Sequence, residues 1–114
     1  MKRIALTLAA VAVLMTPSLR AQDAKKIDAG KQLYAAKECS KCHMIAGKGN
    51  KIGKLDGVAT KLNAADMKKW LTAPADMEKT LDHKPKVKMS SKIGELKLKD
   101  ADIDALVAYL QTLK

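Results

Sequence analysis

The five residues Cys39-Ser40-Lys41-Cys42-His43 constrain this chain more than any other stretch. The C-x-x-C-H spacing predicts covalent attachment of a c-type haem. Two thiols about one helical turn apart can form thioethers with the two vinyl groups of one porphyrin. The next residue, His43, then directs its imidazole at the iron as the proximal ligand.

A bare C-x-x-C pair also occurs in zinc sites and in thioredoxin-like redox centres. Zinc would need about four ligands, and the only further candidates are His43 and His83. A thioredoxin-like centre needs a βαβ pattern around the motif, and the sequence shows none. Haem attachment is therefore the favoured interpretation.

The first 21 residues have the organisation of a secretory signal peptide. A charged start precedes an apolar stretch at residues 4–15, which is short for a transmembrane helix, and residues 17–21 are mostly polar. We expect cleavage after Ala21, export to the periplasm and one mature domain over residues 22–114. A retained N-terminal anchor is the alternative, but stable membrane insertion is not expected.

The composition fits a small domain built around a large cofactor. So short a chain has little apolar surface to bury, and this one has no Phe and a single Trp. A buried porphyrin would supply the missing aromatic mass. Haem attachment would also use both cysteines and leave none for a disulfide.

The first predicted helix covers residues 27–38. Ile27, Gly30 and Tyr34 share one face of it. Glycine inside a helix costs roughly 1 kcal/mol relative to Ala. Its presence here predicts that another helix crosses close to Gly30.

A second helix begins at Asn63 and ends before Pro74. Asn63 and Asp66 have capping-box spacing, and the flanking Leu62 and Met67 are placed for a hydrophobic staple. The buried stripe comprises Met67, Trp70 and Leu71.

The third and strongest helical pattern runs over residues 100–113. Its apolar face comprises Ile103, Leu106, Val107, Leu110 and Leu113. Tyr109 on this helix could border the crossing with Gly30 and Tyr34. No strand pattern or internal repeat is present, so the predicted fold class is all-α.

Two loops separate these helices. Residues 44–58 are rich in glycine and lysine and should wrap the proximal side of the ring, where a backbone carbonyl is expected to accept from His43. Residues 82–98 contain Pro85 and no apolar stripe, so they are predicted to be extended. Met77 and Leu81, four apart, predict one further short helical piece.

These features together resemble a small bacterial, periplasmic class I monohaem cytochrome c over residues 27–114. The resemblance implies the cytochrome c fold, with three main helices and short helical pieces packed around one covalent haem c. It also implies that the N- and C-terminal helices cross beside the haem and that Met89 Sδ is the distal axial ligand. The matching features are Gly30-x-x-x-Tyr34, Cys39 to His43, the glycine-rich loop, Trp70-Leu71 before Pro74, one late loop methionine, and Leu106 to Leu110.

Two features depart from the family pattern. The family usually has a Gly-Pro-x-Leu segment after the haem motif, where this chain has Gly53-Lys54-Leu55. The sequence therefore leaves open which carbonyl holds His43. A proline often follows the axial methionine, whereas Ser90 follows Met89 here.

Ligand chemistry alone leaves three candidates for the sixth position. Met44 adjoins His43 and cannot easily reach the opposite face of the ring, and Met67 occupies the staple position. Met77, Met89 and the nitrogen donor His83 remain, and the family pattern favours Met89. Trp70 is either a core residue or a donor of its indole N–H to a haem propionate.

The lysines are concentrated in two runs that flank the predicted iron ligands. Residues 37–54 hold five lysines and one acid, and residues 84–99 hold six lysines and one acid. The full chain carries +10, and removal of the signal peptide, which has three basic residues and no acid, leaves +7. We expect a docking face for acidic redox proteins or a membrane-bound oxidase or reductase, rather than for nucleic acid.

The main hypothesis is a soluble electron carrier with no catalytic residues, either a monomer or part of a hetero-complex. The first alternative is a haem subunit of a larger periplasmic oxidoreductase that acts on sulfur compounds or alcohols. The second is a site that binds a small ligand through a labile sixth position. The sequence names neither the electron donor nor the acceptor.

Overall fold

The structure is a computed structural model that describes residues 19–114. Most of the predicted signal peptide, residues 1–18, lies outside the described residues, so its cleavage after Ala21 stays a prediction. Within the described part of the chain, no helix combines the length and the apolarity needed to span a membrane.

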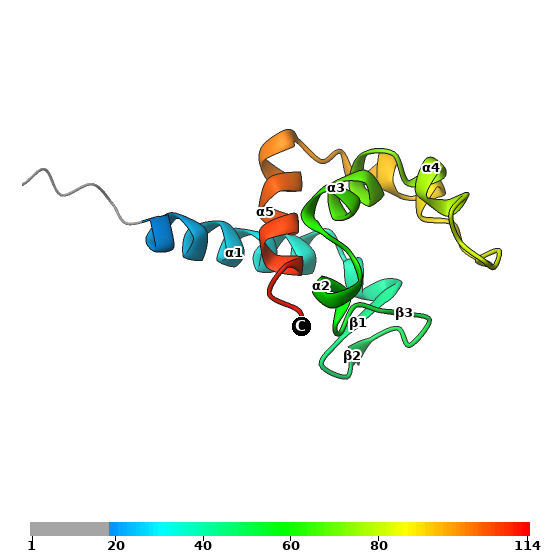
Figure 1. The fold of residues 1–114 in the computed structure, drawn as a ribbon, viewed down its shortest axis with the longest axis horizontal. Coiled ribbons are helices and arrows are strands. Elements are labelled where there is room, and N and C mark those ends of the chain that lie inside the picture. Colours follow the sequence, from blue (N-terminus) through cyan, green and yellow to red (C-terminus); the bar gives the residue numbers. More distant parts are fainter. Residues whose placement is uncertain (1–18) are drawn as a thin grey trace, which may run out of the picture.

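Two long helices cross at the centre of the molecule (Figure 1). Helix α1 covers Leu19–Ala36 and helix α5 covers Asp100–Leu110. A Cβ atom added to Gly30 would lie 2.7 Å from Cβ of Tyr109 and would overlap the Ala105 carbonyl oxygen. The close crossing predicted at Gly30 is therefore confirmed, because only glycine permits this separation.

The aromatic side chains beside the crossing also lie as predicted. Tyr34 of α1 and Tyr109 of α5 pack edge to face, with ring centroids 6.0 Å apart. The helix bounds differ from those predicted. Helix α1 begins eight residues before Ile27, through exposed lysine, alanine and aspartate positions that give no apolar stripe to detect. Helix α5 ends at Leu110, three residues early.

Helix α3, Ala64–Thr72, packs its apolar face against α5. The Asn63 side chain accepts the backbone N–H of Asp66 at 2.8 Å, so the predicted cap is confirmed. Met67 is only 2% exposed and forms a core with Ile103 and Val107, to which Leu62 also packs. Pro74 ends α3 as predicted and opens the short helix α4, Pro74–Glu78.

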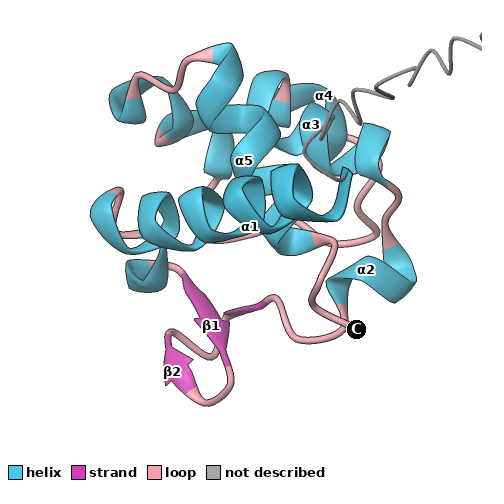
Figure 2. Ribbon diagram, turned by 90° about the vertical axis from the view of Figure 1, so that its left-hand side faces the viewer, coloured by secondary structure: helices cyan, strands magenta, loops and turns pink. Residues whose placement is uncertain are grey.

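The segment after the haem motif is more ordered than the predicted loop. It follows the 3-10 turn η1, Cys39–Lys41, and it forms a small sheet with the order β2-β1-β3 (Figure 2). The strands are β1, His43–Ile45; β2, Lys48–Gly49; and β3, Gly53–Lys54. Strands of two or three residues are too short to show an alternating pattern, so the expectation of no strands was wrong here. The fold remains mostly helical, as the predicted class requires.

Three more short helical elements lie in the predicted loops or at the end of one. Helix α2, Val58–Lys61, follows Gly57, whose φ of 75° favours glycine. The segment at residues 82–98 contains two 3-10 turns, η2 at Met89–Ser91 and η3 at Ile93–Leu96. The remainder of that segment is irregular, in agreement with the prediction.

Candidate functional site

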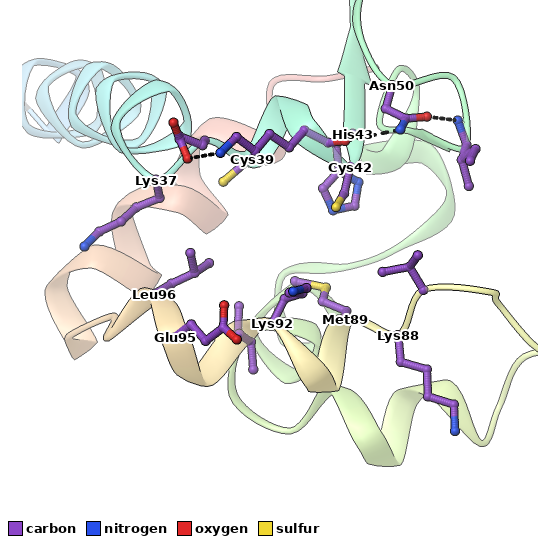
Figure 3. Close-up of a pocket in the computed structure, with 15 residues that line it drawn as sticks. Lys37, Cys39, Cys42, His43, Asn50, Lys88, Met89, Lys92, Glu95 and Leu96 are labelled. Carbon is purple, nitrogen blue, oxygen red and sulfur yellow. Dashed lines mark hydrogen bonds and ion pairs between the residues drawn. The ribbon is translucent and has the colours of Figure 1, made fainter.

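An open cavity of about 380 Å³ lies between the haem motif and the η2–η3 segment (Figure 3). Cys39, Cys42 and His43 lie on one side of it, and Met89 lies on the opposite side. We call residues 37–57 the histidine side and residues 82–98 the methionine side. The remaining lining residues are Lys37, Glu38, Lys41, Asn50, Ile52, Val87, Lys88, Lys92, Ile93, Glu95 and Leu96.

The imidazole of His43 is oriented by a backbone carbonyl. Its Nδ1 lies 3.0 Å from the carbonyl oxygen of Gly53. Because a carbonyl can only accept, Nδ1 carries the proton and Nε2 keeps a lone pair for a metal. This contact identifies the carbonyl that the sequence left open.

The same position explains why residue 53 is glycine. Gly53 pairs with His43 across the parallel strands β1 and β3. An added Cβ would lie 2.7 Å from Nδ1 of His43 and would also overlap the carbonyl oxygen of Cys42. The close approach of strand β3 to the imidazole therefore depends on the missing side chain.

Both cysteines are free thiols on the same side of the cavity. Cys39 opens η1 and Cys42 follows it, so one tight turn brings both cysteines to the cavity wall that also carries His43. Burial raises the pKa of the Cys39 thiol above its usual value. Residues 19–114 contain no group of three or more His, Cys, Asp and Glu side chains that could hold a metal ion.

The candidates for the sixth ligand lie in different parts of the structure. Met89 lines the cavity, whereas Met77 and His83 are absent from its walls. His83 is exposed and pairs with Asp82, with 2.9 Å between Nδ1 and the carboxylate. Met44 and Met67 are both buried away from the cavity.

A carboxylate from α4 contacts the turn that carries Met89. Glu78 accepts the backbone N–H and the hydroxyl of Ser90, each at 2.8 Å. The pKa of Glu78 is held below its usual value, mainly by the hydrogen bond from the Ser90 N–H. The Ser90 hydroxyl, the Lys88 charge and the Met89 N–H lower it further.

Trp70, the predicted propionate contact, is not among the residues that line the cavity. It is half-buried on α3. A hydrogen bond from its indole to a propionate remains a prediction.

Charged side chains from both predicted lysine runs meet at the cavity. Lys37 and Lys41 come from the first run and Lys88 and Lys92 from the second, against two lining glutamates. Two exposed apolar side chains lie among them, Ile52 at 88% and Val87 at 59% exposure. The cavity lining is therefore basic and carries one exposed apolar side chain on each side, Ile52 and Val87.

Sequence reasoning missed two contributors to the site. Asn50 shapes the turn beneath His43, since its side chain donates to the Lys41 carbonyl and accepts the Ile52 N–H. Glu78 reaches the methionine side from twelve residues upstream. The Gly49-Asn50 pair and the Asn50-x-x-Gly53 spacing could have indicated a turn, but no local signal marks Glu78.

The donor set fits a covalently bound haem. Two thiols and an imidazole with a free Nε2 lie on one side, a thioether lies opposite, and Ile93 and Leu96 add apolar surface. Together with the mostly helical fold, these features define a small haem-binding protein.

Comparison with known proteins agrees with this class. The family model for cytochrome c matches residues 27–114, so the chain belongs to the cytochrome c family. Its cofactor is haem c, and proteins of this family generally transfer electrons. No curated protein and no solved structure matches the chain.

Proposed function

We propose that the protein is a soluble periplasmic electron carrier in which His43 and Met89 ligate the haem iron and Cys39 and Cys42 form the thioethers. One observation carries this proposal: Met89 faces the His43 side across a single cavity, and no other methionine of residues 19–114 lines it. Filled axial positions favour transfer of an electron over binding of a substrate.

The chain's own residues define what the site does. Haem iron, when bound, supplies a one-electron change between Fe(II) and Fe(III). Gly53 orients His43, and a thioether opposite an imidazole raises the reduction potential relative to two nitrogen ligands. The cavity is partly open to solvent, which would leave an edge of the ring accessible to a partner.

The basic mouth of the cavity supports docking to an acidic redox protein. Lys37, Lys41, Lys88 and Lys92 lie around the opening through which the electron would leave. Such charges steer encounter and raise the association rate without a large interface. We therefore expect short-lived complexes, as is usual for electron transfer.

The first test replaces the two methionines that remained as candidates. After expression with a haem-maturation apparatus, a pyridine haemochrome spectrum of the wild type should report haem joined by two thioethers. Oxidised wild type should also show the weak red-edge absorption band of an Fe(III)–thioether bond. Met89→Ala should lose this band and gain carbon monoxide binding in the reduced state, while Met77→Ala should retain the wild-type behaviour.

The outcomes separate the elements of the proposal. A colourless wild-type protein would refute the haem site. A band that persists in Met89→Ala and disappears in Met77→Ala would transfer the sixth ligand to α4.

A further inference from the structure

The turn that carries Met89 has little support of its own. Element η2 contains three residues, and its N-terminal Lys88 makes no side-chain cap. Its internal bonds run from the Ser91 N–H and hydroxyl to the Lys88 carbonyl, at 3.1 and 2.6 Å, and from the Lys92 N–H to the Met89 carbonyl, at 2.9 Å. Turns of this kind have poor hydrogen-bond geometry and are stable only in short pieces.

One side chain ties this turn to the helical part of the molecule. The two oxygens of Glu78 separately accept the N–H and the hydroxyl of Ser90, the residue next to Met89. Within residues 19–114, no other element offers the methionine side a hydrogen-bond acceptor: Glu78 accepts both Ser90 donors and also faces the Met89 N–H. Two bonds from one carboxylate fix both the distance and the rotation of the turn.

Glu78 belongs to a helix that is joined directly to the core of the protein. It ends α4, which begins at the buried Pro74, directly after the core helix α3. The contact therefore connects the turn to the core through α3 and α4.

We propose that Glu78 is a positioning residue for the sixth ligand, holding Met89 over the haem through its paired hydrogen bonds to Ser90. This inference rests on the proposed role of Met89. The carboxylate does not touch the iron; it favours the closed position of the turn over positions in which Met89 has moved away. Loss of the contact should make the sixth position easier to open.

Imidazole binding to the oxidised holoprotein measures that opening, because imidazole can ligate only when Met89 has left. The apparent affinity for imidazole is proportional to the population of molecules in which the turn has opened. A substitution that raises this population therefore raises the apparent affinity by the same factor. We expect imidazole to bind Glu78→Ala on the order of tenfold more tightly than wild type. Ser90→Ala retains the N–H bond and should show a smaller increase of about threefold.

Two further variants separate hydrogen bonding from charge and folding. Asp76→Ala removes one negative charge from the same helix, where Asp76 makes only an exposed ion pair with Lys79, and it should bind imidazole like wild type. Glu78→Gln keeps one accepting oxygen and should lie between wild type and Glu78→Ala. If Glu78→Ala does not retain haem, Ser90→Ala against wild type decides the question.

The results distinguish this inference from the proposed function. If wild type lacks the red-edge band, Met89 is not the ligand and the proposed function fails. If wild type has the band but Glu78→Ala and Ser90→Ala both bind imidazole like Asp76→Ala, the positioning role is refuted.

Discussion

The two sides of the cavity are held in different ways. On the histidine side, strand pairing and the Asn50 N–H hold the backbone of His43, and the Gly53 carbonyl holds its imidazole. On the methionine side, the short turn η2 carries Met89, and one side chain, Glu78, joins this turn to α4. The fixed side would set the orientation of the ring, and the loosely held side would set how readily the sixth position opens.

Matched glycine substitutions should show this difference most strongly. Gly53→Ala places a Cβ against the Cys42 carbonyl and His43 Nδ1, whereas a Cβ at Gly94 on the methionine side meets nothing within 4 Å. We expect Gly53→Ala to lower the free energy of unfolding by about 3 kcal/mol and to reduce haem incorporation. Gly94→Ala should leave stability unchanged or raise it by about 0.5 kcal/mol.

Denaturant unfolding and haem content measure both effects. If the two variants lose similar stability, the histidine side is not the more tightly packed one, and the comparison fails.

The sequence predicted the parts of this architecture that depend on local chemistry. The Asn63 cap, the close approach at Gly30 and the apolar face of α5 each follow from a few residues with a definite physical requirement. These features also specify the class, because a C-x-x-C-H motif between crossing helices leaves few alternatives.

What the sequence did not predict depends on contacts between separate segments. The strands β1 and β3 pair over so few residues that no periodicity can appear, and Gly53 was one of several carbonyls available to His43. The bond between Glu78 and Ser90 joins two segments whose pairing only the folded chain reveals.

A buried phenol beside the histidine side gives a smaller, pH-dependent effect. The Tyr34 hydroxyl is buried without a hydrogen-bond partner among the described residues, and burial is the main cause that raises its pKa to about 12 from 10.0. Between these values the unfolded chain releases the proton and the folded chain keeps it, so stability falls as pH rises from about 10 to about 12.

Tyr34→Phe lacks this proton and should lose less stability over the same interval. The urea midpoint at pH 11 relative to pH 9 should therefore fall further in wild type than in the variant. An equal fall in the two proteins would show that Tyr34 ionises at the same pH whether the chain is folded or unfolded.

The smallest effect tests whether docking uses both sides of the cavity. Lys37→Ala on the histidine side and Lys92→Ala on the methionine side each remove one charge from the lining. The reduced protein can be mixed with the anionic oxidant ferricyanide in stopped flow, with Lys61→Ala on α2, away from the cavity, as the control. We expect each lining variant to react about twofold more slowly at low ionic strength, and the difference to vanish when salt screens charges over a Debye length of about 8 Å.

Equal losses from the two sides would mean that the electron leaves between them, so the loosely held side must also keep its charges in place. A loss confined to Lys37 would restrict docking to the fixed side and leave the methionine side to control ligation alone.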